Sequence, residues 1–284
     1  MPSTVIDGIA TRYEVIGEGP PLLMYSPGGF DGTVDKWSTQ GVYARIKLLD
    51  HLPGKYRCIV FDRRETGQSG GRVERLSWQS YVTQGKGLLE HLGIRRAHLM
   101  GACMGVCPAV AFAVEYPDMV QSLVLYWPVG GAKYRINNHQ RFANHLDYVE
   151  GHSLAEVAAH AVSSGKTFGE DPRGGPWASV LRRDPAFAES FAALDRERYK
   201  RIVSDISRAL FDRDTAPGAD PEDLMRLEIP ALIVPGKDVS HATSAARYLE
   251  ECLPRSQYWD VPPEGQTEAT APARVLEFLQ KIKS

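Results

Sequence analysis

The stretch Gly101-Ala102-Cys103-Met104-Gly105 lies between two apolar runs, residues 97–100 and residues 106–116. A small residue two positions before and two positions after the central one, between an expected strand and an expected helix, predicts a sharp turn that exposes the central side chain. A side chain in that position is normally a nucleophile, and a helix that begins just after a cysteine favours its thiolate form. The alternative is a buried cysteine in an ordinary strand–loop–helix connection, because short glycine patterns recur by chance.

The pattern around this stretch divides the chain into three parts. Residues 1–130 and 228–284 alternate short apolar runs with helical patterns, which is typical of an α/β sheet with crossover helices. Residues 131–227 contain no strand pattern, and their periodicity predicts helices over 141–149, 154–162, 177–183, 185–194 and 196–211. We therefore expect one α/β core domain, formed by 1–130 and 228–284, with a helical insertion over 131–227.

Further motifs occur in order along the core. Residues 21–25 form an apolar run followed by Ser26-Pro27-Gly28-Gly29-Phe30, and residues 57–61 form another, followed by Asp62-Arg63-Arg64-Glu65-Thr66-Gly67-Gln68-Ser69. Residues 229–234 lead into Pro235-Gly236-Lys237-Asp238. Together with the stretch around Cys103, these motifs resemble the α/β-hydrolase fold family. The resemblance implies a doubly wound, mostly parallel eight-stranded sheet, with residues 131–227 as a helical cap over the active site.

The resemblance also implies roles for particular residues. Cys103 takes the position of the nucleophile, and the backbone amide of Met104 is expected in the oxyanion hole, where Gly29 or Phe30 would supply a second amide. Asp238 takes the position of the acid that orients the catalytic base, although an aspartate there also suits a turn.

Two aromatic side chains are candidates for the substrate pocket. Trp127 follows the strand after the Cys103 helix, where family members line the pocket, and His139 lies in the first part of the cap. Cap helices also carry such residues on their solvated faces, so contact of His139 with substrate is an expectation to be tested.

One departure from the family concerns the catalytic base. Where family members carry a histidine after the last strand, this chain reads Pro263-Glu264-Gly265-Gln266, and a glutamine cannot take up a proton near neutral pH. The chain is then a natural variant without this base, an inactivated variant of a normal hydrolase, or a protein in which another residue acts as base. His241 is the histidine nearest to Asp238, but it leaves the same loop as Asp238, whereas the family brings its histidine from another loop.

Composition narrows the possible partners. The 284 residues carry a formal net charge of −2, which argues against nucleic acid or an anionic membrane surface as a partner. No apolar run reaches membrane-spanning length, and the start of the chain lacks a signal-peptide pattern, so we expect a cytoplasmic protein. The sequence leaves a homodimer open. The cysteines, which are Cys58, Cys103, Cys107 and Cys252, show no paired framework.

Two functions are compatible with these features. The first is a hydrolase that attacks a small ester, lactone, thioester or related acyl substrate through Cys103. The second is a non-hydrolytic ligand-binding protein, for which Gln266 is the distinguishing feature, because a chain that never hydrolyses tolerates the loss of the base. No metal-ligand spacing, phosphate-binding loop or dinucleotide motif is present, so we expect no metal and no cofactor.

Overall fold

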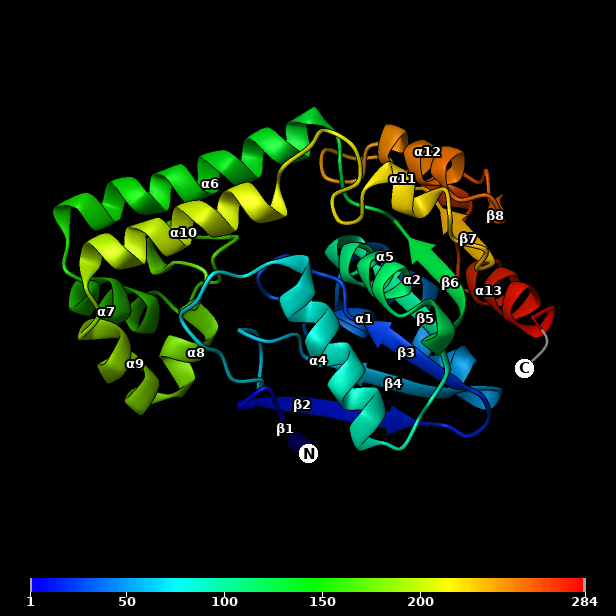
Figure 1. Ribbon diagram of the computed structural model, residues 1–284, viewed down its shortest axis with the longest axis horizontal. Helices are drawn as coiled ribbons and strands as arrows, with labels where there is room; N and C mark the ends of the chain where they lie inside the picture. The colour runs from blue at the N-terminus through cyan, green and yellow to red at the C-terminus, as the bar shows by residue number, and fades with distance from the viewer. Residues whose placement is uncertain (1, 283–284) are drawn as a thin grey trace.

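The computed structural model describes residues 2–282, and an eight-stranded sheet forms the centre of the molecule (Figure 1). The strands lie in the order β1-β2-β4-β3-β5-β6-β7-β8. Pairing is antiparallel between β1 and β2 and between β2 and β4, and parallel for every later neighbour. The strands are β1 (Ser3–Ile6), β2 (Ile9–Ile16), β3 (Pro21–Tyr25), β4 (Arg57–Phe61), β5 (Ala97–Ala102), β6 (Val120–Tyr126), β7 (Ala231–Val234) and β8 (Ser256–Tyr258). The sheet is therefore mostly parallel, as the sequence predicts.

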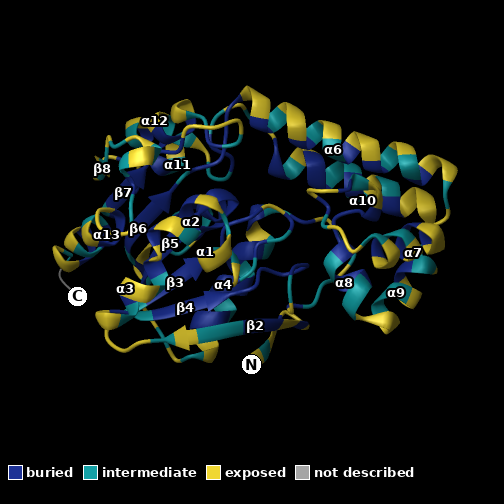
Figure 2. Cartoon of the chain, turned by 180° about the vertical axis from the view of Figure 1, so that it is seen from behind, coloured by how far each residue is buried: buried dark blue, intermediate teal, exposed yellow. Residues whose placement is uncertain are grey.

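Helices cover both faces of the sheet because its central strands are apolar on both sides. In β3, Leu23 and Tyr25 face one hydrophobic cluster while Leu22 and Met24 face the other, and Figure 2 shows these strands buried. The first cluster includes residues of α4 (Trp78–His91), α5 (Val106–Glu115), α11 (Pro221–Leu224) and α12 (Thr243–Cys252). The second includes residues of α1 (Lys36–Thr39), α2 (Gly41–Ile46), α3 (Leu48–His51) and α13 (Ala271–Gln280).

The helical insertion follows β6 and extends to one side of the sheet (Figure 1). Its helices are α6 (Ala132–Gly151), α7 (Leu154–Ser164), α8 (Ala178–Arg183), α9 (Pro185–Ala192) and α10 (Arg196–Leu210). The ring of Phe30, in the loop after β3, packs edge-on against Phe142 of α6 and Phe168, with ring centroids 5.5 and 5.4 Å apart. Phe30 thus joins the loop after β3 to aromatic side chains of the insertion.

The helix α6 is much longer than the expected helix over 141–149. Its five buried residues follow a helical spacing and are Tyr134, Asn138, Phe142, His145 and Val149. Three of them, Tyr134, Asn138 and His145, carry polar groups. Hydrophobic periodicity does not detect a buried face of this kind. The first turn of α6 brings Tyr134 close enough to Cys103 for the charge of Cys103 to raise its pKa.

Candidate active site

Cys103 occupies a sharp turn between β5 and α5. Its φ of 54° is a left-handed value that is costly for a residue with a side chain, and a short 3₁₀ turn over Cys103–Gly105 leads into α5. Both flanking glycines are required by close packing. A Cβ at Gly101 would lie 2.4 Å from the carbonyl oxygen of Gly105, and one at Gly105 would lie 2.5 Å from that of Tyr25. The geometry is that of a nucleophile elbow, with Cys103 8% exposed.

The environment of Cys103 favours its thiolate. Burial alone would raise the pKa of the thiol, but the charge of His241, a polar contact with its imidazole and the backbone amides of Gly28 and Met104 outweigh burial, so the pKa is lowered. The other cysteines differ in this respect. Burial raises the pKa of Cys58 to about 12 and also raises the pKa of Cys107 and of Cys252. Cys107 therefore remains a buried, protonated thiol one helical turn from Cys103.

His241 and Asp238 form a hydrogen-bonded pair although both leave the loop after β7. Asp238 Oδ1 accepts hydrogen bonds from the backbone amides of Ser240 and His241, at 2.8 and 2.9 Å, and this turn folds the chain back on itself. The imidazole Nδ1 of His241 consequently lies 2.8 Å from Asp238 Oδ1. The backbone of His241 also forms a bridge with Gly130, just after β6, which holds the imidazole next to the elbow. The local turn thus removes the geometric objection to a histidine and an acid from one loop.

The opposite nitrogen of this imidazole is left for Cys103. His241 Nε2 is buried and makes no hydrogen bond of ordinary geometry with the residues the structure describes, and such contacts are often loose in a site without substrate. Burial lowers the pKa of His241, but the charge of Cys103 and the hydrogen bond to Asp238 outweigh it and raise the pKa to about 10. The hydrogen bond from His241 in turn lowers the pKa of Asp238 to about 2. These shifts favour the thiolate form of Cys103 and the imidazolium form of His241, with the carboxylate of Asp238 on the far side of the ring.

Gln266, at the usual position of the base, is part of the core. Its side chain is fully buried, and Oε1 accepts hydrogen bonds from Tyr126 Oη at 3.0 Å and Trp127 Nε1 at 2.7 Å. Its Nε2 donates to the carbonyl oxygens of Pro235 and Val261, at 2.8 and 2.9 Å. The two acceptor and two donor bonds use the full capacity of the amide, so Gln266 is held away from proton transfer.

The loop after β3 supplies the second amide beside the sulfur. The backbone amides that lower the pKa of Cys103 are those of Met104 and of Gly28, which lies one residue before the expected Gly29 and Phe30. The guanidinium of Arg63 donates to the carbonyl oxygens of both Gly28 and Gly29. Because the C=O and N–H of a trans peptide point in opposite directions, this anchor directs the amide of Gly29 away from Arg63. Arg63 is fully buried and forms no ion pair with a carboxylate among residues 2–282, so its hydrogen bonds to this loop are its main polar contacts.

Two tyrosines near the thiol were not expected from the sequence. Tyr43 of α2 is buried, and its hydroxyl has no hydrogen-bond partner among the residues that the structure describes. Burial, followed by the charge of Cys103, raises its pKa. Tyr134 of α6 is also buried, and the charges of Cys107 and Cys103 add to the effect of burial on its pKa. No motif marks these tyrosines, because only the folded chain brings α2 and α6 to the elbow.

The two predicted pocket residues have different surroundings. The ring of Trp127 packs against the imidazole of His241 with centroids 5.2 Å apart, so this residue borders the Asp238–His241 pair. His139 directs one ring nitrogen to the carbonyl oxygen of Phe211 at 2.8 Å and the other to Ser207 Oγ at 2.9 Å. Both nitrogens of His139 therefore connect α6 to the end of α10, and these contacts give no support to the predicted contact with substrate.

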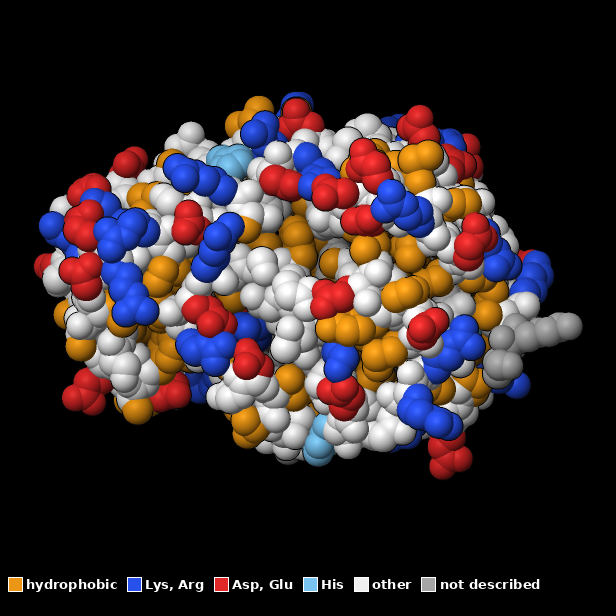
Figure 3. All heavy atoms as spheres, viewed as in Figure 1, with side chains coloured by type: hydrophobic (Ala, Val, Ile, Leu, Met, Phe, Trp, Pro, Cys, Tyr) orange, Lys and Arg blue, Asp and Glu red, His pale blue; other side chains and the backbone are white. Residues whose placement is uncertain are grey.

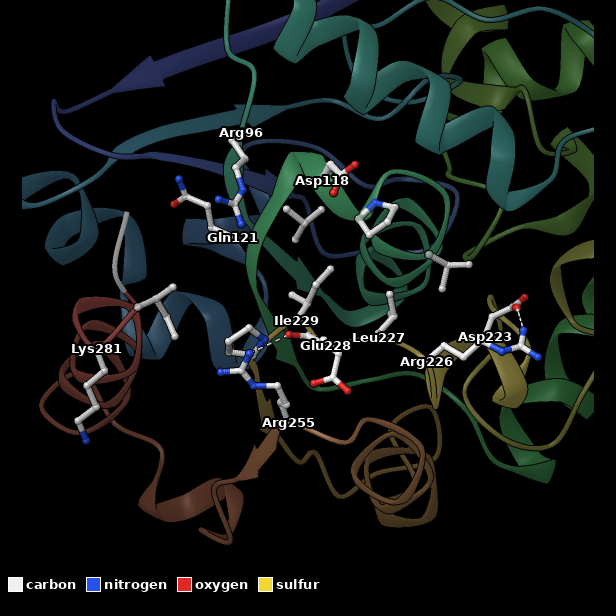
Figure 4. Close-up of a pocket in the computed structure, with 15 residues that line it drawn as sticks. Arg96, Asp118, Gln121, Asp223, Arg226, Leu227, Glu228, Ile229, Arg255 and Lys281 are labelled. Carbon is white, nitrogen blue, oxygen red and sulfur yellow. Dashed lines mark hydrogen bonds and ion pairs between the residues drawn. The ribbon is translucent and has the colours of Figure 1, made fainter.

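The large surface hollow in Figure 4 lies away from this site. It has a volume of about 770 Å³ and is lined by residues at the amino ends of β6, β7 and β8, such as Val120, Ile229 and Arg255. Cys103 follows the carboxyl end of β5, which lies at the opposite edge of a parallel sheet. Ligands of open α/β sheets bind at the carboxyl ends of the strands, so the hollow is not part of the candidate active site.

Other kinds of site find little support. Figure 3 shows acidic and basic side chains interspersed over one face of the molecule, without a continuous area of one sign. In the part of the chain that the structure describes, no three His, Cys, Asp or Glu side chains are grouped so that they could hold a metal ion. Among residues 2–282, none of the helices combines the length and the apolar character needed to cross a lipid bilayer.

The sequence profile of the alpha/beta hydrolase fold family matches residues 21–265, and the chain belongs to this family. A similar curated protein is the 2-hydroxy-6-oxo-6-phenylhexa-2,4-dienoate hydrolase of Comamonas testosteroni, which is 49% identical over 122 residues, or 42% of this chain and 40% of the relative. The matches to the first three curated relatives span only 31%, 25% and 40% of the length of those proteins.

Solved structures extend the likeness over the whole chain. An alpha/beta hydrolase enzyme from a Medee basin deep-sea metagenome library has a TM-score of 0.63 at 20% identity, covering 100% of this chain and 98% of the other. The enol-lactonase of Burkholderia xenovorans LB400 has a TM-score of 0.61 at 18% identity, covering 99% of this chain and 100% of the other. At these identities the structures show that the fold is shared.

Proposed function

We propose that this chain is a thiol-dependent hydrolase of small acyl substrates, with Cys103 as nucleophile, His241 as acid and base, and Asp238 as the carboxylate that orients His241. The observation that carries this proposal is the combination of a strained, left-handed elbow at Cys103 with an imidazole–carboxylate pair beside it and a thiol whose pKa is lowered. The names of the relatives support a carbonyl compound as substrate, since one is a hydrolase of an oxo-dienoate and another an enol-lactonase. An ester, lactone, thioester or related acyl compound fits this chemistry.

The first half of the proposed reaction acylates the enzyme. The thiolate of Cys103 attacks the carbonyl carbon, and the carbonyl electron pair moves to the oxygen, where the amide of Met104 and those of the loop after β3 stabilise the charge. When the intermediate collapses, the bond to the leaving group breaks and His241 Nε2 gives its proton to that group. The products of this half are a thioester on Cys103 and a neutral imidazole.

The second half releases the acyl group. The neutral imidazole of His241 takes a proton from a water molecule as its oxygen attacks the thioester carbon. Collapse of this second intermediate breaks the carbon–sulfur bond, which restores the thiolate and leaves a carboxylic acid. Asp238 keeps Nδ1 protonated throughout, so that Nε2 is the nitrogen that exchanges protons.

Intact-protein mass spectrometry tests this mechanism. The wild type and a His241→Gln variant are incubated with a panel of activated esters and lactones, with Cys103→Ala as the control that cannot form a thioester. We expect an acyl adduct on Cys103 that accumulates in His241→Gln, because the variant retains the nucleophile but lacks the base for deacylation. Turnover by Cys103→Ala at the wild-type rate would refute the proposal. Binding of a compound without adduct or turnover in any variant would support the ligand-binding alternative.

A further inference from the structure

The position that carries the base in related sequences has a different task here, and its hydrogen bonds indicate what that task is. The orientation of the Gln266 amide is determined by its partners. The indole N–H of Trp127 can only donate, and the carbonyl oxygens of Pro235 and Val261 can only accept. Oε1 must therefore face Trp127, and Nε2 must face the two carbonyl groups. A histidine at this position could make at most two of these four bonds.

Two of the bonds reach the immediate surroundings of His241. Pro235 directly follows β7 and is the first residue of the loop that carries the Asp238–His241 pair. Trp127 packs its ring on the imidazole at 5.2 Å. A Cβ at Gly236 would lie 2.6 Å from His241 Cβ and 2.9 Å from Trp127 Cδ2, which shows how closely the loop, the indole and the imidazole pack. Gln266 thus contacts both the loop that carries the base and the ring that supports it.

The backbone of Trp127 needs such support. Its φ of 53° is left-handed, which is unfavourable for a bulky residue and persists only where the surroundings hold it. The main restraints are the hydrogen bond from its backbone amide to Val234, at 2.8 Å, and the indole bond to Gln266. Loss of the second restraint frees the ring that borders one face of His241.

We propose that Gln266 is a positioning residue that holds His241 against Cys103, through the indole of Trp127 and through the carbonyl group of Pro235. This inference rests on the proposed function, in which His241 is the base. It explains how a chain with glutamine at the usual base position keeps a catalytic pair. The histidine lies in the loop after β7, and the glutamine in the loop after β8 fixes its orientation.

The experiment measures the pH dependence of Cys103 alkylation by iodoacetamide, a reaction that needs no substrate. The variants are Gln266→Met, which keeps the side-chain length and removes all four hydrogen bonds, and Trp127→Phe, which keeps a ring beside His241 and removes the indole N–H. The control is Gln84→Met. Gln84 is a buried glutamine on α4 that also uses both ends of its amide, with bonds to Thr11, Asp62 and Arg64.

We expect Gln266→Met to move the midpoint of the alkylation profile upward by on the order of one pH unit, because a displaced imidazolium stabilises the thiolate less. With an activated ester, kcat should fall by roughly tenfold to a hundredfold while KM changes little, the effect of a small misplacement of a catalytic group. Trp127→Phe should shift the midpoint in the same direction. A variant with both changes, Gln266→Met and Trp127→Phe, should shift the midpoint by less than the sum of the two single shifts, because both changes act through the contact between Gln266 and Trp127.

Gln84→Met should lower the melting temperature and leave the midpoint unchanged, which separates positioning from general destabilisation. A Gln266→Met variant with the wild-type midpoint would overturn the inference, as would strictly additive shifts in the double variant. If Gln266→Met does not fold, the Trp127→Phe shift decides alone. Failure of the proposed function would appear differently, as an intact alkylation profile in a wild-type protein that forms no acyl adduct.

Discussion

Replacement of His241 by glutamine tests the centre of the site, because it removes the charge and the proton carrier while retaining a polar side chain of similar length. Three influences lower the pKa of Cys103 against burial: the charge of His241, the polar contact with its imidazole and the two backbone amides. Without His241, only the amides oppose burial, so the pKa of the thiol should rise above the wild-type value. A thiol with an ordinary pKa of about 8.5 is only about 3% thiolate at about pH 7, and a buried thiol is less ionised still.

Turnover should fall further than ionisation alone requires. The variant also lacks a donor for the leaving group and a base for water, and each positioned acid or base contributes roughly a hundredfold to ten-thousandfold. We expect the alkylation midpoint to move to higher pH and hydrolysis of an activated ester to fall by at least about a hundredfold. The midpoint is the more reliable measure, since a thiolate of lower pKa is also intrinsically less nucleophilic and the rates partly compensate.

The assay is the pH–rate profile for iodoacetamide, read by mass spectrometry at Cys103, with ester turnover measured in parallel. His98→Gln is the matched control. His98 is a buried histidine on β5 that pairs with Ser122, and burial lowers its pKa to about 4, so it is uncharged near neutral pH. This variant should keep the wild-type midpoint. If His241→Gln keeps the wild-type midpoint and turnover, then the reasoning from the thiolate–imidazolium pair is refuted.

Three further predictions follow from the same contacts. Asp238→Asn keeps the acceptor of the turn but removes a charge that raises the pKa of His241 to about 10, so the alkaline limb of the turnover profile should move to lower pH. The shift should be modest because the Asp238 side chain is 46% exposed, and an unchanged limb would contradict the assigned pair. Gln266→His should leave turnover no higher than in the wild type. It should lower the free energy of unfolding, measured by urea denaturation, by about 2–5 kcal/mol, because the buried partners of Gln266 lose at least two hydrogen bonds. A large gain in turnover would show instead that the wild-type chain lacks a catalytic base. Arg63→Met should lower kcat by roughly tenfold or more and leave the alkylation midpoint nearly unchanged, because it removes the hydrogen bonds to the carbonyl groups of Gly28 and Gly29. If kcat of the variant equals that of the wild type, Arg63 has no role in orienting this loop.

The order of motifs along the chain was sufficient to predict the fold. Parallel strands that end in short, sterically demanding turns leave local signals, such as the glycines around Cys103, because a Cβ at either glycine would meet backbone atoms. The mostly parallel eight-stranded sheet with a helical insertion follows from these signals, and the family profile and the structure confirm it. The length of α6 was not predictable in this way, because its buried face is largely polar.

The residues of the candidate site also fall into those that local sequence predicts and those that only the fold brings together. Local sequence determined the elbow at Cys103, the aspartate after β7 and the absence of histidine at Gln266, since each depends on a few neighbouring residues. Only the tertiary structure decided that the turn at Asp238 brings His241 to the thiol, that the Gly28 amide is directed at the sulfur, and that Gln266 is saturated with hydrogen bonds. These features join the loops after β3, β5, β6, β7 and β8, and sequence patterns do not encode how close such loops come. Their distances depend on the packing of the whole sheet, which brings the carboxyl ends of its strands to one edge.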